Sequence, residues 1–198
     1  MKRLFDIVAS GCGLLVLSPL FLILAVWVKI DSPGPVFYRQ VRVGRNNKDF
    51  KLFKFRSMRV GSDKNGLITV GGHDPRITRS GYYIRKYKLD ELPQLINVFI
   101  GDMSLVGPRP EVRKYVNLYT PEQMHVLDVR PGITDMASIC YRNENELLET
   151  VKNPENYYQT VIMQDKLRFN LEYVKHHSFL GDLRLIFKTI KCVVHEEE

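Results

Sequence analysis

A long apolar run near the N-terminus constrains this chain more than any other feature. Between Ile7 and Ile30 the only charged residue is Lys29, close to the end of the run. The run is long enough for one transmembrane helix, which needs about 20 apolar residues. A cleaved signal peptide fits less well, because the run is long for its apolar core and no small-residue cleavage site follows.

The pair Ser18-Pro19 divides this run in its middle. Proline removes a backbone hydrogen bond and clashes with the preceding turn, so the helix is expected to break there. Each arm is then about 12 residues or about 18 Å long, well short of the roughly 30 Å hydrocarbon core. Basic residues flank both ends, which predicts that both ends stay in the cytoplasm. We therefore expect residues 1–32 to form a re-entrant membrane hairpin, with a kinked spanning helix as the alternative.

Residues 33–198 have the composition of a basic soluble domain, which we expect to form one catalytic domain at the membrane interface. The chain carries a net charge of +7 and has a pI of about 9.3, so its partner is expected to be anionic: nucleic acid, lipid headgroups or a phosphorylated substrate. The three cysteines are far apart and the histidines form no zinc pattern, which argues for a reducing compartment and against a disulfide scaffold.

The first part of this domain predicts a β-hairpin. Two strand-like runs, 36–41 and 50–55, are separated by turn residues at 44–47. Lys51, Lys54 and Arg56 would project from the hairpin, either as a solvated strand face or as a phosphate-binding edge.

The rest of the domain is predicted to be mainly helical, so the fold class is α+β. Helices are expected at 78–88, after 92, after Thr120, and over 143–151, 157–175 and 178–191. The last of these is amphipathic and basic, and it can lie in a membrane interface or pack on the core. The loop 61–74 contains neither a Walker A motif nor a dinucleotide fingerprint.

The adjacent carboxylates Asp90 and Glu91 form the main candidate site. Asp90 could cap the following helix, but Pro93 would then occupy the third helical position and has no N–H to donate. Asp90 could instead be a metal ligand or a nucleophile. A basic helix, carrying Arg85 among others, leads into the pair, which suits a phosphorylated substrate with a divalent metal.

Arg109 lies between Pro108 and Pro110 and has two possible roles. It can be a surface arginine on a rigid loop, or a pre-organised guanidinium that binds phosphate with little loss of entropy.

Several short motifs in the chain match one family, in the family's order. They are Lys2-Arg3-Leu4-Phe5-Asp6, Ser18-Pro19, Phe53-Lys54-Phe55-Arg56-Ser57-Met58, Leu89-Asp90-Glu91-Leu92-Pro93-Gln94-Leu95, Gly101-Asp102-Met103-Ser104, Val106-Gly107-Pro108-Arg109-Pro110 and Val129-Arg130-Pro131-Gly132-Ile133-Thr134. Each is weak alone, but together, over most of the chain, they are highly specific. The chain resembles the bacterial sugar transferases, the monotopic phosphoglycosyl transferases that begin glycoconjugate assembly.

The resemblance implies transfer of a phospho-sugar from a UDP-sugar to a polyprenyl phosphate such as undecaprenyl phosphate, with release of UMP. It implies Mg²⁺, held in part by Asp90, and a covalent intermediate on Asp90, with Glu91 orienting the metal or moving a proton. It also implies a membrane break at Ser18-Pro19 and a place on the cytoplasmic face of the bacterial inner membrane, with homo-oligomerisation possible. The candidates for substrate binding are Lys54, Arg85, Arg109, Arg130 and Arg142.

The chain departs from the family pattern after Thr134. Family members commonly continue with Gly and later Asn-Gly-Arg-Asn, whereas here Asp135 and Tyr141 replace the glycines. We expect this departure to affect which sugar or nucleotide is recognised more than the reaction itself.

Two other functions are open to such a sequence. A membrane-tethered nucleic-acid-binding or scaffold protein would explain the positive charge, but nothing resembles a recognition fold and the acidic pair has no role there. A polytopic transferase with direct attack in a ternary complex would need more than one hydrophobic segment.

Overall fold

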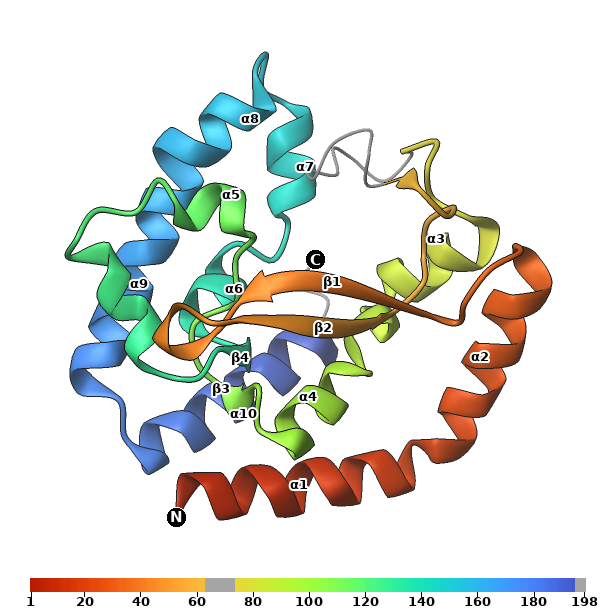
Figure 1. Ribbon diagram of the computed structural model, residues 1–198, viewed down its shortest axis with the longest axis horizontal. Coiled ribbons are helices and arrows are strands. Elements are labelled where there is room, and N and C mark those ends of the chain that lie inside the picture. Colours follow the sequence, from red (N-terminus) through yellow and green to blue (C-terminus); the bar gives the residue numbers. More distant parts are fainter. Residues whose placement is uncertain (63–73, 195–198) are drawn as a thin grey trace.

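The computed structural model describes residues 1–62 and 74–194, and it is mainly helical with two small sheets (Figure 1). The helices are α1 (Lys2–Val16), α2 (Ser18–Asp31), α3 (Arg79–Lys86), α4 (Gln94–Ile100), α5 (Arg113–Val116), α6 (Met136–Cys140), α7 (Glu144–Glu149), α8 (Pro154–Tyr157), α9 (Met163–His176) and α10 (Phe179–Val194). The strands are β1 (Phe37–Val43), β2 (Asp49–Phe55), β3 (Ser104–Val106) and β4 (Gly132–Thr134). The α+β class is as predicted, and most of the loop expected at 61–74 lies outside the described residues.

Helices α1 and α2 form a bent pair, with α1 along the base of Figure 1 and α2 rising beside the domain. The axes bend by 61° at Leu17, and Pro19 lies in the first turn of α2, where its missing N–H leaves no helical bond unmade. The expected break at Ser18-Pro19 is therefore confirmed. In the part of the chain that the structure describes, no single helix is long and apolar enough to cross a membrane, and this bent pair passes that test only when taken together.

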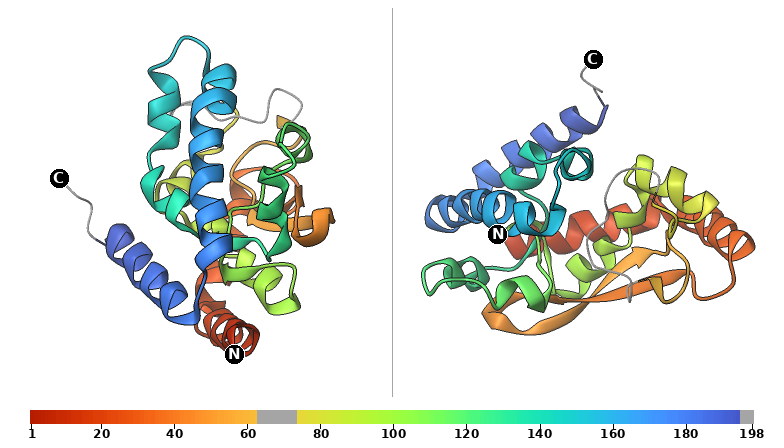
Figure 2. Two further views of the ribbon diagram at one scale, coloured as in Figure 1. Left: turned by 90° about the vertical axis from the view of Figure 1, so that its left-hand side faces the viewer. Right: turned by 90° about the horizontal axis from the view of Figure 1, so that it is seen from above.

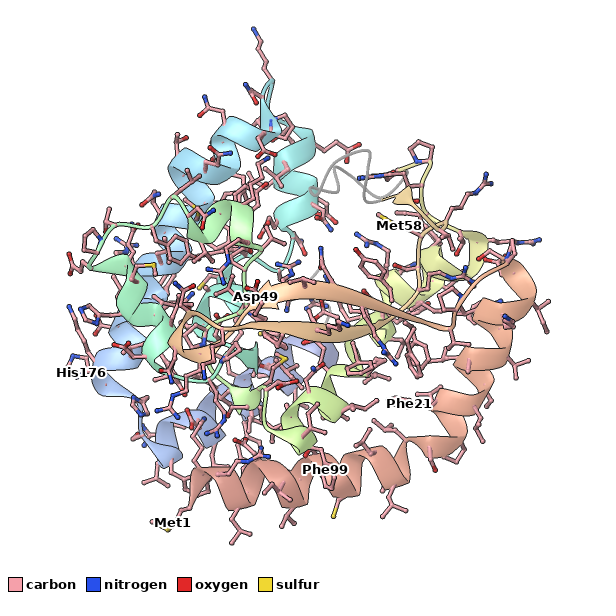
Figure 3. All side chains as sticks on the ribbon, in the orientation of Figure 1. Met1, Phe21, Asp49, Met58, Phe99 and His176 are labelled. Atoms are coloured by element: carbon pink, nitrogen blue, oxygen red, sulfur yellow. The ribbon has the colours of Figure 1, made fainter. Side chains whose placement is uncertain are left out.

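Two glycines let α1 approach α4 closely. A Cβ atom on Gly11 would lie 3.3 Å from the Phe99 ring, and one on Gly13 would lie 3.3 Å from the Leu95 side chain. Figure 3 shows Phe99 directly above α1. The glycines of the apolar run thus serve helix packing against the domain.

Helix α2 has one buried face and one exposed face. Leu24 and Val28 pack with Phe55 of β2 and Ile84 of α3, and Phe21 points into the same angle of the bent pair (Figure 3). The opposite side of the pair carries side chains that are each more than half exposed: Leu4, Val8, Leu15, Val16, Leu22, Ile23, Val26 and Ile30. An apolar surface of this size suits contact with a non-aqueous partner.

The predicted β-hairpin is present, with β1 antiparallel to β2 and Phe37 opposite Phe55. One expectation about it is wrong. Arg56 does not project from the hairpin but is 4% exposed, and its guanidinium donates to the carbonyls of Val28, Ser32 and Pro33. These carbonyls lie at the C-terminal end of α2, which favours a nearby cation. Arg56 therefore ties the hairpin to the bent pair.

Strands β3 and β4 form a parallel pair that was not predicted from the sequence. Ser104 lies opposite Gly132, and Val106 lies opposite Thr134. The backbones come so close just beyond β3 that a Cβ atom on Gly132 would lie 2.1 Å from the nitrogen of Gly107. This sheet positions the two loops that follow it, which carry Arg109 and Asp135.

The second half of the chain forms a helical layer over its own core. The buried residues are Val112, Tyr115, Val126, Leu148, Tyr158, Ile162, Met163 and Leu167. The helix start predicted at Thr120 is confirmed by reciprocal bonds between Thr120 and Gln123, although the helix that follows is a 3₁₀ helix, Gln123–Asp128. A π-helical stretch, Tyr158–Ile162, joins α8 to α9.

Helix α10 lies beside the rest of the body (Figure 2). Its inner side contacts the domain through the buried Asp182 and through Thr189, whose hydroxyl lies 2.7 Å from that of Thr134. Leu180, Phe187 and Ile190 remain 68%, 71% and 53% exposed. The helix packs on the domain with one side and leaves an apolar side uncovered, so its place at a membrane interface stays a prediction.

Candidate functional site

The acidic pair lies in a tight turn between α3 and α4. Lys88 has a left-handed conformation (φ 55°), which ends α3, and the 3₁₀ turn Leu89–Glu91 follows at once. Helix α4 begins only at Gln94, after Pro93, and no side chain caps it. The interpretation of Asp90 as a helix cap is therefore wrong, and its carboxylate has no capping duty.

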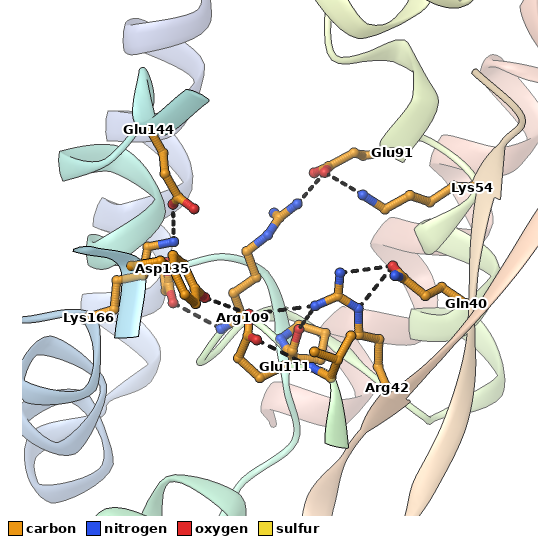
Figure 4. Close-up of polar contacts among 12 residues, drawn as sticks. Gln40, Arg42, Lys54, Glu91, Arg109, Glu111, Asp135, Glu144 and Lys166 are labelled. Atoms are coloured by element: carbon orange, nitrogen blue, oxygen red, sulfur yellow. Dashed lines mark hydrogen bonds and ion pairs between the residues drawn. The ribbon is translucent and has the colours of Figure 1, made fainter. Parts of the chain in front are cut away.

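Glu91 joins two basic residues that are distant from it in the sequence (Figure 4). Lys54 Nζ of β2 lies 3.0 Å from Glu91 Oε1, and the Arg109 guanidinium contacts the same oxygen. Burial of Glu91 acts to raise its pKa, but the charges of Arg109 and Lys54 outweigh this and hold the pKa well below its usual range. The same pairing raises the pKa of Arg109. Two of the predicted phosphate-binding residues thus meet at the acidic pair.

Asp90 differs sharply from its neighbour. It is 6% exposed, and among the described residues no hydrogen bond reaches its carboxylate. Burial raises the pKa of Asp90, while the positive charges of Lys54, Arg85 and Lys88 act in the opposite direction. A buried carboxylate without a structural partner is available to a ligand.

The loop that carries Arg109 is held by Asp135. Asp135 is 1% exposed, accepts the backbone N–H of Arg109 at 2.9 Å and caps α6 by accepting the N–H of Ser138 at 2.6 Å. The departure from the family pattern at Asp135 therefore fixes the backbone of a candidate phosphate-binding residue. The sequence analysis had noted Asp135 only as a difference.

Lys54 is held in place through Asn97, a residue that the sequence analysis did not single out. Asn97 is fully buried on α4, accepts the N–H of Phe53 at 2.9 Å and donates to the carbonyl of Lys51 at 2.8 Å. The helix that follows the acidic pair is thereby fixed to the strand that carries Lys54. The signal available in the sequence was one polar residue within the otherwise apolar run Leu95–Ile100.

The other predicted basic residues lie at different distances from this cluster. Arg85, in the last turn of α3, is close enough for its charge to act on the pKa of Asp90. Arg130 donates to the carbonyl of Gly101, at the opposite end of α4, and the exposed Arg142 donates to a carbonyl of α10. Substrate binding by Arg130 and Arg142 therefore stays a prediction that these contacts do not support.

The described residues contain no group of three or more carboxylate, histidine or cysteine side chains that could enclose a metal. Mg²⁺, however, is commonly bound by one or two carboxylates together with substrate phosphates. Asp90 offers such a carboxylate, whereas Glu91 is already engaged by two cations. The residues present therefore fit an ion that binds together with a phosphorylated ligand.

Comparison with known proteins agrees with this geometry. The family model for bacterial sugar transferases matches residues 1–196. The chain is 39% identical over 197 residues to the UDP-N-acetylgalactosamine-undecaprenyl-phosphate N-acetylgalactosaminephosphotransferase of Aeromonas hydrophila (98% of this chain, 44% of the relative). It is 38% identical over 194 residues to the UDP-glucose:undecaprenyl-phosphate glucose-1-phosphate transferase of Escherichia coli K12 (96% of this chain, 39% of the relative).

A third relative, the exopolysaccharide production protein PSS of Rhizobium leguminosarum bv. phaseoli, is 39% identical over 197 residues, with 96% of this chain and 93% of the relative covered. The chain thus spans less than half of the first two relatives and nearly all of the third. The match over the whole chain leads to one conclusion: this chain belongs to the bacterial sugar transferase family.

Proposed function

We propose that this protein transfers a sugar-1-phosphate from a UDP-sugar to undecaprenyl phosphate and releases UMP, as a first membrane step in the assembly of a glycan. The observation that carries the proposal is the contrast within the acidic pair. Asp90 is buried and has no hydrogen-bond partner in the part of the chain that the structure describes, whereas Glu91 beside it contacts the two cations Lys54 and Arg109. Phosphoryl transfer depends mostly on positioning and charge neutralisation, and this set of residues supplies both.

The reaction would proceed in two half-reactions. A carboxylate oxygen of Asp90 attacks the phosphorus next to the sugar, and the bond from that phosphorus to the bridging oxygen breaks, so that UMP leaves with that oxygen. An oxygen of undecaprenyl phosphate then attacks the same phosphorus and releases the Asp90 carboxylate. Lys54, Arg109 and Arg85 hold the phosphate oxygens in both steps.

Mg²⁺ would be held by Asp90 and the diphosphate, and when bound it neutralises phosphate charge and favours the ionised form of the carboxylate. Glu91 keeps the two cations directed at the site.

A lipid acceptor accounts for the apolar surfaces. The exposed face of α1 and α2, together with Leu180, Phe187 and Ile190 of α10, would contact lipid on the cytoplasmic face of the inner membrane. The bent pair would enter one leaflet and return, which keeps the site near the headgroups, where the acceptor phosphate lies. The relatives act on different sugars, N-acetylgalactosamine phosphate and glucose phosphate, at nearly equal identity, so identity does not select the sugar.

The decisive experiment omits the lipid acceptor. Purified protein with a UDP-sugar and Mg²⁺ should release UMP and gain the mass of one phospho-sugar on the peptide that contains Asp90. A panel of UDP-sugars identifies the donor. UMP release that requires undecaprenyl phosphate, with no adduct on the protein, would show direct attack by the lipid instead of a covalent intermediate.

A further inference from the structure

Gln94 has a buried amide group that nothing in the fold accounts for. Its side chain is 1% exposed, and among the described residues its Nε2 atom has no hydrogen-bond partner. A buried donor without a partner loses its bonds to water and gains nothing in return, so such a group in a native protein calls for an explanation.

The helical spacing places Gln94 next to the acidic pair. The bonds Leu92 N to Leu89 O and Leu95 N to Leu92 O follow the three-residue pattern of a 3₁₀ helix, in which side chains three apart lie above one another. Glu91 and Gln94 share this spacing, and Asn97 follows Gln94 by three residues within the α-helix α4, where such residues also lie near one another on one face. Gln94 therefore lies on the same side of the helix as the Glu91 carboxylate, one turn farther along.

The residues on either side of Gln94 in this row both contact β2. Glu91 binds the Lys54 side chain, and Asn97 binds the backbone of Phe53 and Lys51. From its place in this row, Gln94 is expected to point towards β2, between these two sets of contacts. Asp90, whose carboxylate has no hydrogen-bond partner among the described residues, lies four residues before it in the chain. Two unsatisfied groups, one donor and one acceptor, thus lie within one helical turn of each other.

We infer that Gln94 is a further substrate-contacting residue of this site, whose Nε2 donates a hydrogen bond to a non-bridging phosphate oxygen of the donor diphosphate. The inference rests on the proposed function. The free group is a donor, so its ligand must offer an acceptor, and the neighbouring Lys54 and Arg109 already select for an anion. In a site shielded from water, a neutral donor stabilises the negative charge that develops on phosphoryl oxygens. Unlike a cation, it needs no counter-charge when the site is empty.

The competing explanation is structural. Gln94 could act as a second amide that ties α4 to β2, as Asn97 does. The two roles predict opposite effects of Gln94→Met, a variant of similar length that lacks the donor. Loss of a tie lowers the unfolding temperature and spares the activity of the folded molecules. Loss of a substrate contact lowers activity and leaves the unfolding temperature equal or higher, because an unsatisfied donor has been removed.

The test compares wild type, Gln94→Met and Gln94→Glu in detergent. Ser104→Ala is the matched control, because Ser104 on β3 is also 1% exposed with an unpartnered hydroxyl but lies beyond the other end of α4. We expect Gln94→Met to lower the single-turnover rate of UMP release without acceptor by about 100-fold, as for other single donors to a developing oxyanion. Gln94→Glu should be at least as impaired, and Ser104→Ala should keep wild-type kinetics.

A second measurement separates this inference from the proposed reaction. UDP with Mg²⁺ should raise the unfolding temperature of the wild type, and the rise should be much smaller in Gln94→Met. If the wild type binds UDP but releases no UMP from any UDP-sugar, the proposed reaction is wrong. The rise in unfolding temperature caused by UDP then still decides whether Gln94 contacts the diphosphate. Wild-type kinetics and a wild-type shift in Gln94→Met, or no shift in the wild type itself, would overturn the inference.

Discussion

Two regions of the molecule are rich in charged side chains but use them differently. One is the junction between the bent helix pair and the domain, and the other is the region around Glu91. At the junction, defined here as Lys2, Arg3, Asp6, Asp31 and Arg56, most contacts are with backbone; the exceptions are those of Lys2 with Asp182 and Tyr173 and of Asp31 with the Ser80 hydroxyl. Arg3 donates to the carbonyls at the end of α4, and Arg56 donates to those at the end of α2. Asp6 accepts the N–H of Leu105, and Asp31 accepts that of Ser80 at the start of α3.

Around Glu91 the contacts run between side chains, and some groups are left without any. Lys54 and Arg109 share one carboxylate oxygen, while Asp90 and Gln94 have no partner among the described residues. Backbone partners are permanent parts of the fold, whereas an ion pair at a partly exposed site can be exchanged for a charged ligand. The comparison teaches that the type of partner, more than the charge itself, separates a structural cation from a binding one.

The largest effect is expected from Asp90→Asn. An amide is a poor nucleophile and a poor Mg²⁺ ligand, so UMP release and adduct formation should both fall by about a thousandfold or more. Stability should hardly change, because Asp90 has no structural partner to lose. Glu91→Gln should also cripple turnover by releasing Lys54 and Arg109 from their shared oxygen. An active Asp90→Asn enzyme would overturn the covalent mechanism.

Arg56→Met should show the opposite pattern. It removes the charged donor of three carbonyls near the end of α2, of which that of Val28 keeps the N–H of Ser32. Hydrogen bonds to a charged group contribute about 1.5–3 kcal/mol each, so the two carbonyls left without a donor predict a loss of about 3 kcal/mol or more in unfolding free energy. The molecules that remain folded should keep their turnover number. Lys51→Met, on the exposed face of the same strand, is the control for thermal unfolding. A variant of normal stability but low activity would move Arg56 into the site.

Lys54→Ala and Arg109→Ala should each lower kcat/KM by about tenfold or more, in line with charge-assisted contacts of about 1.5–3 kcal/mol. Arg85→Ala should belong to the same group, because its charge reaches Asp90. Steady-state kinetics with the identified UDP-sugar make the measurement. The same assay on Arg130→Ala and Arg142→Ala decides whether these two residues bind substrate or only hold the fold. Wild-type kinetics in Lys54→Ala or Arg109→Ala would contradict the proposed difference between binding and structural cations.

The smallest energetic effect is expected from Pro19→Ala, which acts on topology. Restoring a regular helix should shift some molecules from a re-entrant to a spanning arrangement. A cysteine in an N-terminal extension, with Cys12, Cys140 and Cys192 replaced, should resist a membrane-impermeant thiol reagent in intact cells and become more reactive in Pro19→Ala. Ready labelling of the parent protein from outside would show a spanning helix. The extension leaves Lys2 in its contact with Asp182.

Local features of the sequence determined the bent helix pair, the β-hairpin and the acidic turn. A proline in the interior of a helical run ends or kinks the helix before it, and two strand-like runs joined by turn residues pair with each other without help from distant parts of the chain. The family, too, followed from short motifs in a fixed order. In each case the information lies within a few residues.

Long-range contacts decided the rest. Lys54 and Arg56 are two residues apart and chemically similar. Only the packing of α2 against β2 makes Lys54 a candidate site residue and Arg56 a buried residue that holds the two elements together. The three-residue strands β3 and β4 are too short to leave a periodic signal, and their pairing, like the support of Arg109 by Asp135, joins segments about 26 residues apart in the chain. Hydrogen-bond partners are set by which surfaces meet in space, and for these residues that is known only once the chain has folded.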